Sequence, residues 1–327
     1  MSIIDQYLDG TFEGATKDRA YQKQLAAESR APVYALAAPN VMDREPKKDV
    51  FLGRYLVMAN RALGVENYFP RFQWSGTCVG QSKALLASIG VAVNALLSGL
   101  RFPGMVSMAP IYGGSRVEIG RQPGRWDGSV GSWAAGWITK FGVVTMREMG
   151  IDDSMKDEKS WLRAIQAEER LAVAWAASRS GVPANYEAMA KLRPFASSPL
   201  VTTPEEVRAS LSNLTPVNVC GSVHPSKELD SRGVSKSIKR GGGHSTGIIG
   251  CHFDGKDWWY DHVNSWGAFY RGGFARAGHP MDKLFRGSVT RIPESWLLHW
   301  LRERDCYALV GVQGLEPIDP MFEDLLR

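Results

Sequence analysis

The sequence predicts an α+β protein of two lobes, in which a mainly helical half precedes a mainly β half. Apolar residues recur at helical spacing through much of residues 51–200, whereas residues 201–327 contain short apolar or alternating runs separated by glycine and Asp-Gly turns. A candidate nucleophile, Cys78, lies in the first half and a candidate base, His244, in the second. A site built from both residues would lie in the cleft between the halves.

Residues 1–50 are polar and mixed, with helical periodicity only near residues 18–28. They are predicted to form an arm or tether before a domain of residues 51–327. In that domain the helical lobe covers residues 51–200 and the β lobe residues 201–327. Helices are expected at residues 51–63, 78–97, 132–141, 158–178, 203–214 and 294–304, and strands at 216–220, 246–251, 258–263 and 307–312.

Helix-stop and helix-start residues support these limits. The first three helices are each followed by a glycine, at Gly64, Gly99 and Gly142, which is the residue that most readily ends a helix. The helix of residues 203–214 begins with Thr203 as an N-cap and Pro204 at the first helical position, followed by acidic residues in the first turn.

The composition is that of an ordinary globular protein. Of the 327 residues, 44% are hydrophobic and 22% are charged, and the formal net charge is +5. This excess is small and no basic stretch is interleaved with aromatic residues, so we expect no nucleic-acid partner. The cysteines are scattered without metal-ligand spacing, which predicts reduced thiols and neither a metal nor another cofactor; they are Cys78, Cys220, Cys251 and Cys306.

No segment is predicted to enter a membrane. The first residues lack a basic stretch followed by an apolar core, so they do not look like a secretory signal. The most apolar run, residues 84–97, is interrupted by polar residues and glycine and is shorter than the ~20 residues that a bilayer demands. We therefore expect no membrane insertion.

Cys78, His244 and Asn264 together provide the groups that acyl transfer needs. Cys78 is predicted at a helix N-terminus, where partial positive charge favours the thiolate. His244 follows the glycines of residues 241–243 and precedes an apolar run, so it is expected at a strand entrance near the cleft. Asn264 would hold the imidazole ring in one tautomer, with Trp266 shielding that hydrogen bond from water.

The other histidines and cysteines carry weaker signals. His262 lies two positions before Asn264, so strand alternation puts both on one face and makes His262 the alternative base. The remaining cysteines are interpreted as small buried hydrophobic residues. Surface or structural roles are assigned to the remaining histidines, which are His224, His252, His279 and His299.

The segment 224–243 carries five basic residues among serines and glycines. This composition predicts a solvated, mobile flap. A gate over the cleft that selects acidic substrates is the alternative interpretation.

Three sequence blocks resemble those of the papain-like cysteine peptidases (the C1 family), especially the bacterial and phage branches of that family. The blocks are Gly76-Thr77-Cys78-Val79-Gly80, Gly243-His244-Ser245 and Asn264-Ser265-Trp266-Gly267. The similarity covers about residues 70–315, including Gly272-Gly273-Phe274 after the Asn block. The resemblance implies that Cys78 is the nucleophile, His244 the general base and acid and Asn264 the orienting residue, with Gln73 and the Cys78 N–H as the oxyanion hole.

The chain departs from the family pattern at several positions. Gln73 lies five residues before Cys78, whereas the family places its oxyanion glutamine six residues before the cysteine. Ser75 stands where secreted members carry a disulfide cysteine, which favours a reducing compartment. The inhibitory pro-segment of the family is not recognisable in residues 1–50.

Two hypotheses of function follow. The first is a cysteine endopeptidase or amide hydrolase that cleaves a protein or peptide substrate through an acyl-enzyme on Cys78. The second uses the same fold as a structural or binding component of a larger assembly, such as a phage virion, with residues 1–50 attached to an assembly partner. A cytoplasmic or virion-associated location is expected under either hypothesis.

Overall fold

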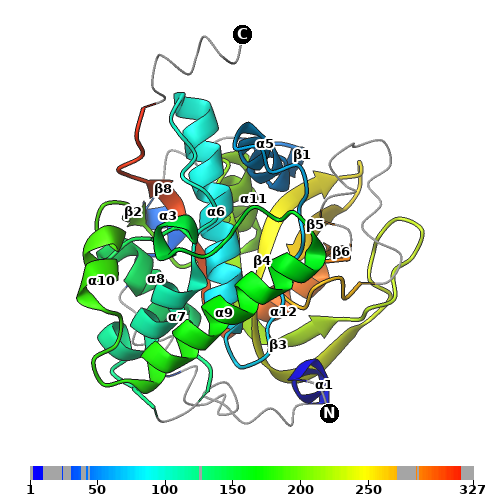
Figure 1. Ribbon diagram of the computed structural model, residues 1–327. Helices are drawn as coiled ribbons and strands as arrows, with labels where there is room; N and C mark the ends of the chain where they lie inside the picture. Colours follow the sequence, from blue (N-terminus) through cyan, green and yellow to red (C-terminus); the bar gives the residue numbers. More distant parts are fainter. Residues whose placement is uncertain are drawn as a thin grey trace.

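The computed structural model describes residues 3–9, 24, 31–37, 42, 45–124, 127–270, 285 and 287–317. Figure 1 shows the central helix α6 (Cys78–Ser98) between a group of helices on one side and a twisted antiparallel sheet on the other. Helix α6 packs on helix α7 (Met108–Gly114) and on the long strand β4 (Ile238–Phe253). The predicted α+β architecture of two lobes is confirmed.

The helices of the first half lie close to their predicted limits. Helices α7 and α10 and the short turns η1 and η2 were not expected, because their short segments show too little periodicity to be recognised. Besides α6 and α7, the first half contains α1 (Ile3–Asp9), α3 (Tyr34–Ala37), α5 (Gly53–Ala62), the π-helix η1 (Ser115–Ile119), α8 (Gly131–Lys140), the 3₁₀ turn η2 (Arg147–Met149), α9 (Glu158–Ala177) and α10 (Ala184–Ala190).

Helix α6 is the core helix of the domain. It is apolar around most of its circumference and ends at Gly99, whose φ of 61° is a left-handed conformation that glycine adopts without strain. It approaches α7 closely at Gly80, where a β-carbon would come within 2.8 Å of Tyr112. Its length and composition alone would allow it to span a membrane. However, 83% of its most apolar 18-residue stretch is buried inside the protein.

The sheet has the strand order β6-β5-β4-β3-β7, with β1 also paired to β4, and all pairs are antiparallel. A second, two-stranded sheet pairs β2 with β8. The remaining bounds are β1 (Asp49–Phe51), β2 (Phe195–Ser197), β3 (Val217–Pro225), β5 (Trp258–Val263), β6 (Val289–Pro293), β7 (Cys306–Ala308), β8 (Val310–Val312), and the flanking helices α11 (Pro204–Ser212) and α12 (Glu294–Glu303).

The start of α11 confirms the N-cap predicted from the sequence. The Thr203 hydroxyl accepts a hydrogen bond from the Glu206 N–H at 3.2 Å, and the Glu206 carboxylate accepts one from the Thr203 N–H at 3.1 Å. This reciprocal pair is a capping box, which satisfies two N–H groups that a helix start otherwise leaves without partners.

The segment 224–243 forms a hairpin, which was not expected from the sequence, since β3 and β4 extend into it. Its mobility stays a prediction. Strands β3 and β4 continue to the pair Pro225↔Ile238. The turn between them is held by hydrogen bonds such as that from the Val234 N–H to the Asp230 carboxylate, at 2.9 Å. The basic side chains are mostly exposed, but Val234 and Ser235 are buried, so the turn packs on the protein instead of standing free in solvent.

Parts of the N-terminal region contact the domain. Strand β1 begins at Asp49 and pairs with β4, Tyr34 is buried, and helix α1 packs against β4. The helical pattern near residues 18–28 lies almost entirely outside the described residues. The boundary near residue 50 stays a prediction.

A buried ion pair fixes the chain that leads into α6. The Arg71 guanidinium donates to Glu168 on α9, and both side chains have no exposed surface. The Arg71 Nε–H also donates to Gln81 Oε1 on α6 at 2.7 Å, and the second Glu168 oxygen accepts from the Met108 N–H at 2.6 Å. Arg71 thus connects the loop before Cys78 to α6 and α9, and its partner Glu168 extends this contact to the start of α7.

We predict that Arg71→Met lowers the free energy of unfolding by about 3–5 kcal/mol, because it leaves the Glu168 carboxylate buried without its counter-ion. Lys191→Met is the matched control: Lys191 pairs with Glu187, but the lysine side chain is 54% exposed, and such surface pairs contribute less than about 1 kcal/mol. Urea unfolding of both variants measures the difference. Equal effects of the two substitutions would contradict this account of the buried pair.

Candidate active site

Cys78 is the first residue of α6 and is fully buried. The N-cap residue Thr77 makes no side-chain cap hydrogen bond, since its hydroxyl donates to Glu169 instead. The first turn of a helix presents N–H groups and partial positive charge, which favour a thiolate over a thiol at this position. The structure therefore places Cys78 at the start of α6, as the sequence predicts.

Glu169 on α9 holds the loop that precedes Cys78. Its carboxylate accepts from the Trp74 N–H at 3.0 Å, from the N–H and hydroxyl of Ser75 at 2.9 and 2.7 Å, and from the Thr77 hydroxyl at 2.6 Å. Burial raises the pKa of Glu169 despite these hydrogen bonds. The Gly76 N–H donates to Asp127 at 2.6 Å. The loop therefore has little freedom to move relative to α9.

His244 lies on β4 and contacts the two residues that the sequence assigned to it. Its Nε2 lies 2.8 Å from Asn264 Oδ1, and the Trp266 indole stacks on the imidazole with centroids 4.3 Å apart and planes inclined by 18°. Asn264 Oδ1 also accepts from the Ser265 N–H at 2.7 Å. Because an amide oxygen only accepts, Nε2 carries the hydrogen, and Nδ1 is the ring nitrogen that would take a proton.

Hydrogen bonds behind the site join the two lobes. The hydroxyls of Ser82 on α6 and Ser245 on β4 lie 2.6 Å apart, and the Asn218 amide donates to Ser245 at 2.9 Å. Gly247 allows β4 to approach α6, since a β-carbon there would meet Leu86 at 2.6 Å. Ser82 follows Cys78 by one helical turn and Ser245 follows His244, so this contact brings the start of α6 beside the part of β4 that carries His244.

Burial sets the protonation state of His244. Desolvation lowers the pKa of His244 well below its usual value, and the neighbouring His224 lowers it further, although the hydrogen bond with Asn264 acts in the opposite direction. The imidazole is therefore neutral near pH 7. A neutral ring is the form that can accept a proton from a thiol.

Gln73 lies beside the Asn264 block. Its Oε1 accepts from the Ser265 hydroxyl at 2.8 Å and its Nε2 donates to the Ser75 carbonyl at 3.2 Å. Next to these contacts, Phe72 and Trp266 are paired by an isolated antiparallel β-bridge. The structure thus brings Gln73 beside Ser265, and one of the two hydrogens on its Nε2 is directed to the protein main chain.

His262, the alternative base, has both ring nitrogens engaged. Nε2 lies 2.8 Å from the Thr246 hydroxyl and Nδ1 lies 3.2 Å from the Tyr270 hydroxyl. Burial lowers the pKa of His262 to about 3. This geometry is that of a structural histidine, which favours His244 as the base.

His224 is a residue near the site that sequence reasoning did not assign to it. Its ring centroid lies 5.6 Å from that of His244, and its Nε2 donates to the Gly242 carbonyl at 2.8 Å. Regular alternation would put His224 on the face opposite to Gly221, the partner of His244. A register shift between Gly221 and Val223 changes this alternation. No sequence pattern predicted this shift, so His224 was not assigned to the site.

Other sequence expectations concern groups outside the site. Cys220, Cys251 and Cys306 are buried free thiols, and burial raises the pKa of Cys251 to about 12. Within the described ranges, no group of three or more His, Cys, Asp or Glu residues could hold a metal ion. The expected turn at Gly272-Gly273-Phe274 and His279 lie outside the described residues.

The buried histidines predict a pH dependence of stability. The pKa values of His244 and His262 are lowered in the folded protein, so below about pH 6.5 the unfolded chain binds protons that the folded chain does not. The free energy of unfolding should therefore fall as pH drops from 7 to 5.5, a window above most carboxylate titrations.

We predict that His262→Gln reduces this slope by up to about 1.4 kcal/mol per pH unit, the value for one proton. Urea unfolding at pH 7, 6.2 and 5.5 checks the change. A slope that is identical in both proteins would show that His262 is not buried in its neutral form.

The fold is shared with known cysteine proteases. The structure of xylellain, a cysteine protease from Xylella fastidiosa, matches with a TM-score of 0.53 and 14% identity over 86% of this chain and 89% of that chain. Procathepsin B S9 from Trypanosoma congolense matches with a TM-score of 0.52 and 10% identity over 95% of each chain. No protein-family model and no curated protein sequence matches the chain. The chain therefore has the fold of the papain-like cysteine proteases.

Proposed function

We propose that the protein is a cysteine peptidase or amide hydrolase that acts through an acyl-enzyme on Cys78. The observation that carries the proposal is the His244–Asn264 hydrogen bond of 2.8 Å under the Trp266 ring. His244 is on β4, which packs on the helix that begins at Cys78, in a chain with the fold of cysteine proteases. A neutral histidine with one ring nitrogen held by Asn264 can exchange a proton through the other nitrogen.

The proposed reaction has two stages. His244 Nδ1 takes the thiol proton of Cys78, and the thiolate sulfur forms a bond to the substrate carbonyl carbon. The Cys78 N–H stabilises the oxyanion, and His244 then returns the proton to the leaving nitrogen as the C–N bond breaks. In the second stage His244 takes a proton from water and the hydroxide forms a bond to the thioester carbon. The C–S bond then breaks, the carboxylic acid product leaves, and His244 returns the proton to the Cys78 sulfur.

Gln73 is the proposed second donor to the oxyanion. Its buried position beside Ser265 supports this role. Its Nε2 carries two hydrogens, of which one is donated to the Ser75 carbonyl, so the other is the one proposed to reach the oxyanion. The shorter spacing between Gln73 and Cys78 is compatible with this role, because the amide remains in the loop next to the helix start.

Aromatic residues beside His244 support a preference for apolar groups on the leaving side of the substrate. His244 protonates the leaving nitrogen, so that part of the substrate lies toward His244 and Trp266. Phe72 bridges to Trp266, and the Trp74 ring lies 4.8 Å from that of Phe72. Trp74 is 38% exposed, although the loop that carries it is tightly held. An exposed, fixed indole of this kind offers a surface for an apolar side chain.

The roles of residues 1–50 and the cellular location stay predictions from the sequence. We retain attachment of residues 1–50 to an assembly partner and a cytoplasmic or virion-associated location as proposals. If the following experiment finds no reactive thiol, it would favour the alternative, in which the papain-like fold serves only in assembly.

The proposal predicts that an epoxide-type thiol-protease inhibitor modifies Cys78 once per chain. His244→Ala should lower the rate of modification by at least about 100-fold, within the range of general-base contributions. Cys78→Ala should show no adduct, and circular dichroism of each variant checks its fold. Intact-mass and peptide mass spectrometry locate the adduct. An unmodified Cys78 in the wild-type protein, or equal rates with and without His244, would contradict the proposal.

We predict that Trp74→Ala lowers kcat/KM about tenfold for peptides with Leu or Phe directly after the scissile bond, because one apolar contact contributes about 1–3 kcal/mol. Peptides with Gly there should change less than about threefold. Leu97→Ala is the matched control, since Leu97 is 61% exposed at the opposite end of α6. Equal losses for all peptides would contradict a role of Trp74 in specificity.

A further inference from the structure

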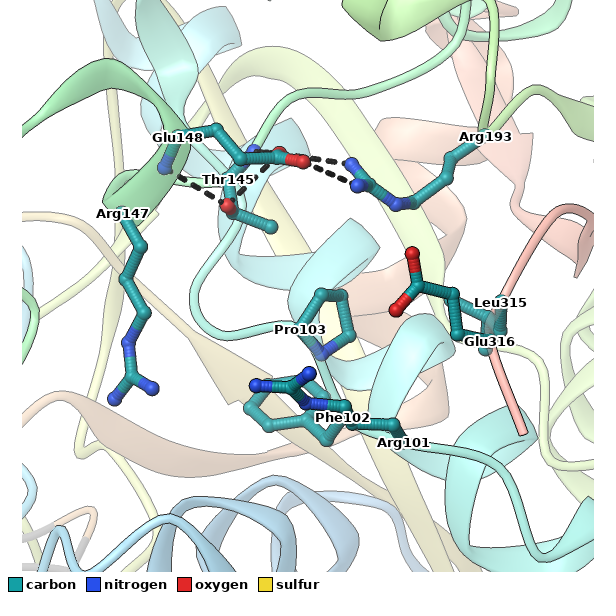
Figure 2. A pocket seen from close by; sticks show the side chains of 9 residues that line it. All are labelled: Arg101, Phe102, Pro103, Thr145, Arg147, Glu148, Arg193, Leu315 and Glu316. Carbon is teal, nitrogen blue, oxygen red and sulfur yellow. Dashed lines mark hydrogen bonds and ion pairs between the residues drawn. The ribbon is translucent and has the colours of Figure 1, made fainter. Parts of the chain in front are cut away.

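A second cavity lies at the end of α6 opposite to Cys78. Its volume is about 240 Å³, and it is lined where residues 101–103 leave the helix and where the chain passes through residues 315–316. The cavity lies along the C-terminal half of α6, a helix of 21 residues that spans roughly 30 Å and begins at Cys78. It is therefore separate from the candidate active site, and Figure 2 shows its lining side chains.

One wall of the cavity is a closed ion pair. Both terminal nitrogens of Arg193 donate to the Glu148 carboxylate, one of them at 2.8 Å. The same carboxylate accepts from the N–H and hydroxyl of Thr145 at 2.8 and 2.9 Å. Figure 2 shows these contacts as one network at one side of the cavity. The Glu148 carboxylate therefore accepts four hydrogen bonds from the protein, and the charge of Arg193 is balanced.

A second arginine is also paired. The Arg147 Nε–H donates to Asp153 at 2.5 Å, and the other oxygen of Asp153 accepts from the Met105 N–H at 3.0 Å. The Arg147 side chain is 38% exposed and reaches the cavity from the side opposite to Glu316. This pair adds rigid structure to the cavity but no net charge.

Arg101 and Glu316 are the two other charged residues that line the cavity. Their backbones are joined by a hydrogen bond from the Arg101 N–H to the Glu316 carbonyl at 2.8 Å. In the part of the chain that the structure describes, neither side chain makes an ion pair or hydrogen bond, and no dashed line joins them in Figure 2. Phe102, which is only 5% exposed, lines the cavity together with Pro103 and Leu315.

The charges of the cavity indicate the class of ligand. Two of its three arginines are balanced by Glu148 and Asp153, which leaves one guanidinium and one carboxylate. A simple dianion would meet the charge of Glu316, whereas a molecule with one carboxylate and one ammonium would satisfy both groups. The volume is below the roughly 300 Å³ at which pockets for drug-sized molecules begin, so the ligand is small.

We propose that this cavity binds a small zwitterion, namely a free α-amino acid or a dipeptide, with its carboxylate on Arg101 and its ammonium on Glu316. Phe102, Pro103 and Leu315 would contact an apolar side chain. The proposal does not depend on the proposed function. A peptidase would nevertheless release molecules of this class, so the cavity could sense its own products.

The test is isothermal titration calorimetry of the full chain with L-leucine, chosen because its side chain suits the apolar wall. Saturable binding is expected. L-leucinamide lacks the carboxylate and N-acetyl-L-leucine lacks the ammonium, and each should bind at least about tenfold more weakly, since a hydrogen bond to a charged group contributes about 1.5–3 kcal/mol.

Variants of the chain locate the binding. Arg101→Gln and Glu316→Gln should each weaken L-leucine binding at least about tenfold. Arg163→Gln on the exposed face of α9 should leave it unchanged. Three results would overturn the proposal: no saturation up to about 50 mM L-leucine, equal affinity for N-acetyl-L-leucine, which would indicate a plain anion site, or unaltered binding in both variants.

Discussion

The contact between α6 and β4 is the constraint on which the candidate site depends. The candidate nucleophile Cys78 and the candidate base His244 come from different lobes and are separated by more than half of the chain. The buried hydrogen bond between Ser82 and Ser245 and the close approach at Gly247 fix the helix against the strand. A buried hydroxyl without a hydrogen-bond partner destabilises the fold. Any shift of α6 along β4 that separates Ser82 from Ser245 would therefore lower the stability of the protein. The geometry of Cys78 relative to His244 is therefore set by packing behind both residues.

The loop before Cys78 is held by two adjacent acidic residues of α9 that point to different partners. Glu168 faces Arg71 and the start of α7, whereas Glu169 accepts hydrogen bonds from the loop itself. A buried carboxylate needs such partners, so Glu168 and Glu169 together hold α9 against the loop. The Trp74 side chain nevertheless remains partly exposed on this fixed support. A rigid backbone with an accessible aromatic side chain is what a substrate-binding rim requires.

Local signals in the sequence were sufficient for the helices and for much of the sheet. The capping box of α11, the glycine after α6 and the limits of β5 follow from nearby residues alone. Glu168 and Glu169 were not foreseen, because glutamates on an amphipathic helix ordinarily face solvent and their partners are distant in sequence. The position of His224 depends on a register shift in β3, and the hairpin on packing of Val234, neither of which a local pattern encodes.

The most direct test of a functional Cys78–His244 pair is the pH dependence of Cys78 alkylation by iodoacetamide, followed by mass spectrometry in the wild-type protein and in His244→Ala. An activated cysteine should react at pH 6 at least about tenfold faster than an ordinary thiol with a pKa near 8.5, and this excess should disappear without His244. If both proteins instead show one rate that rises about tenfold per pH unit toward 8.5, the histidine does not activate the thiol and the account of the site is wrong.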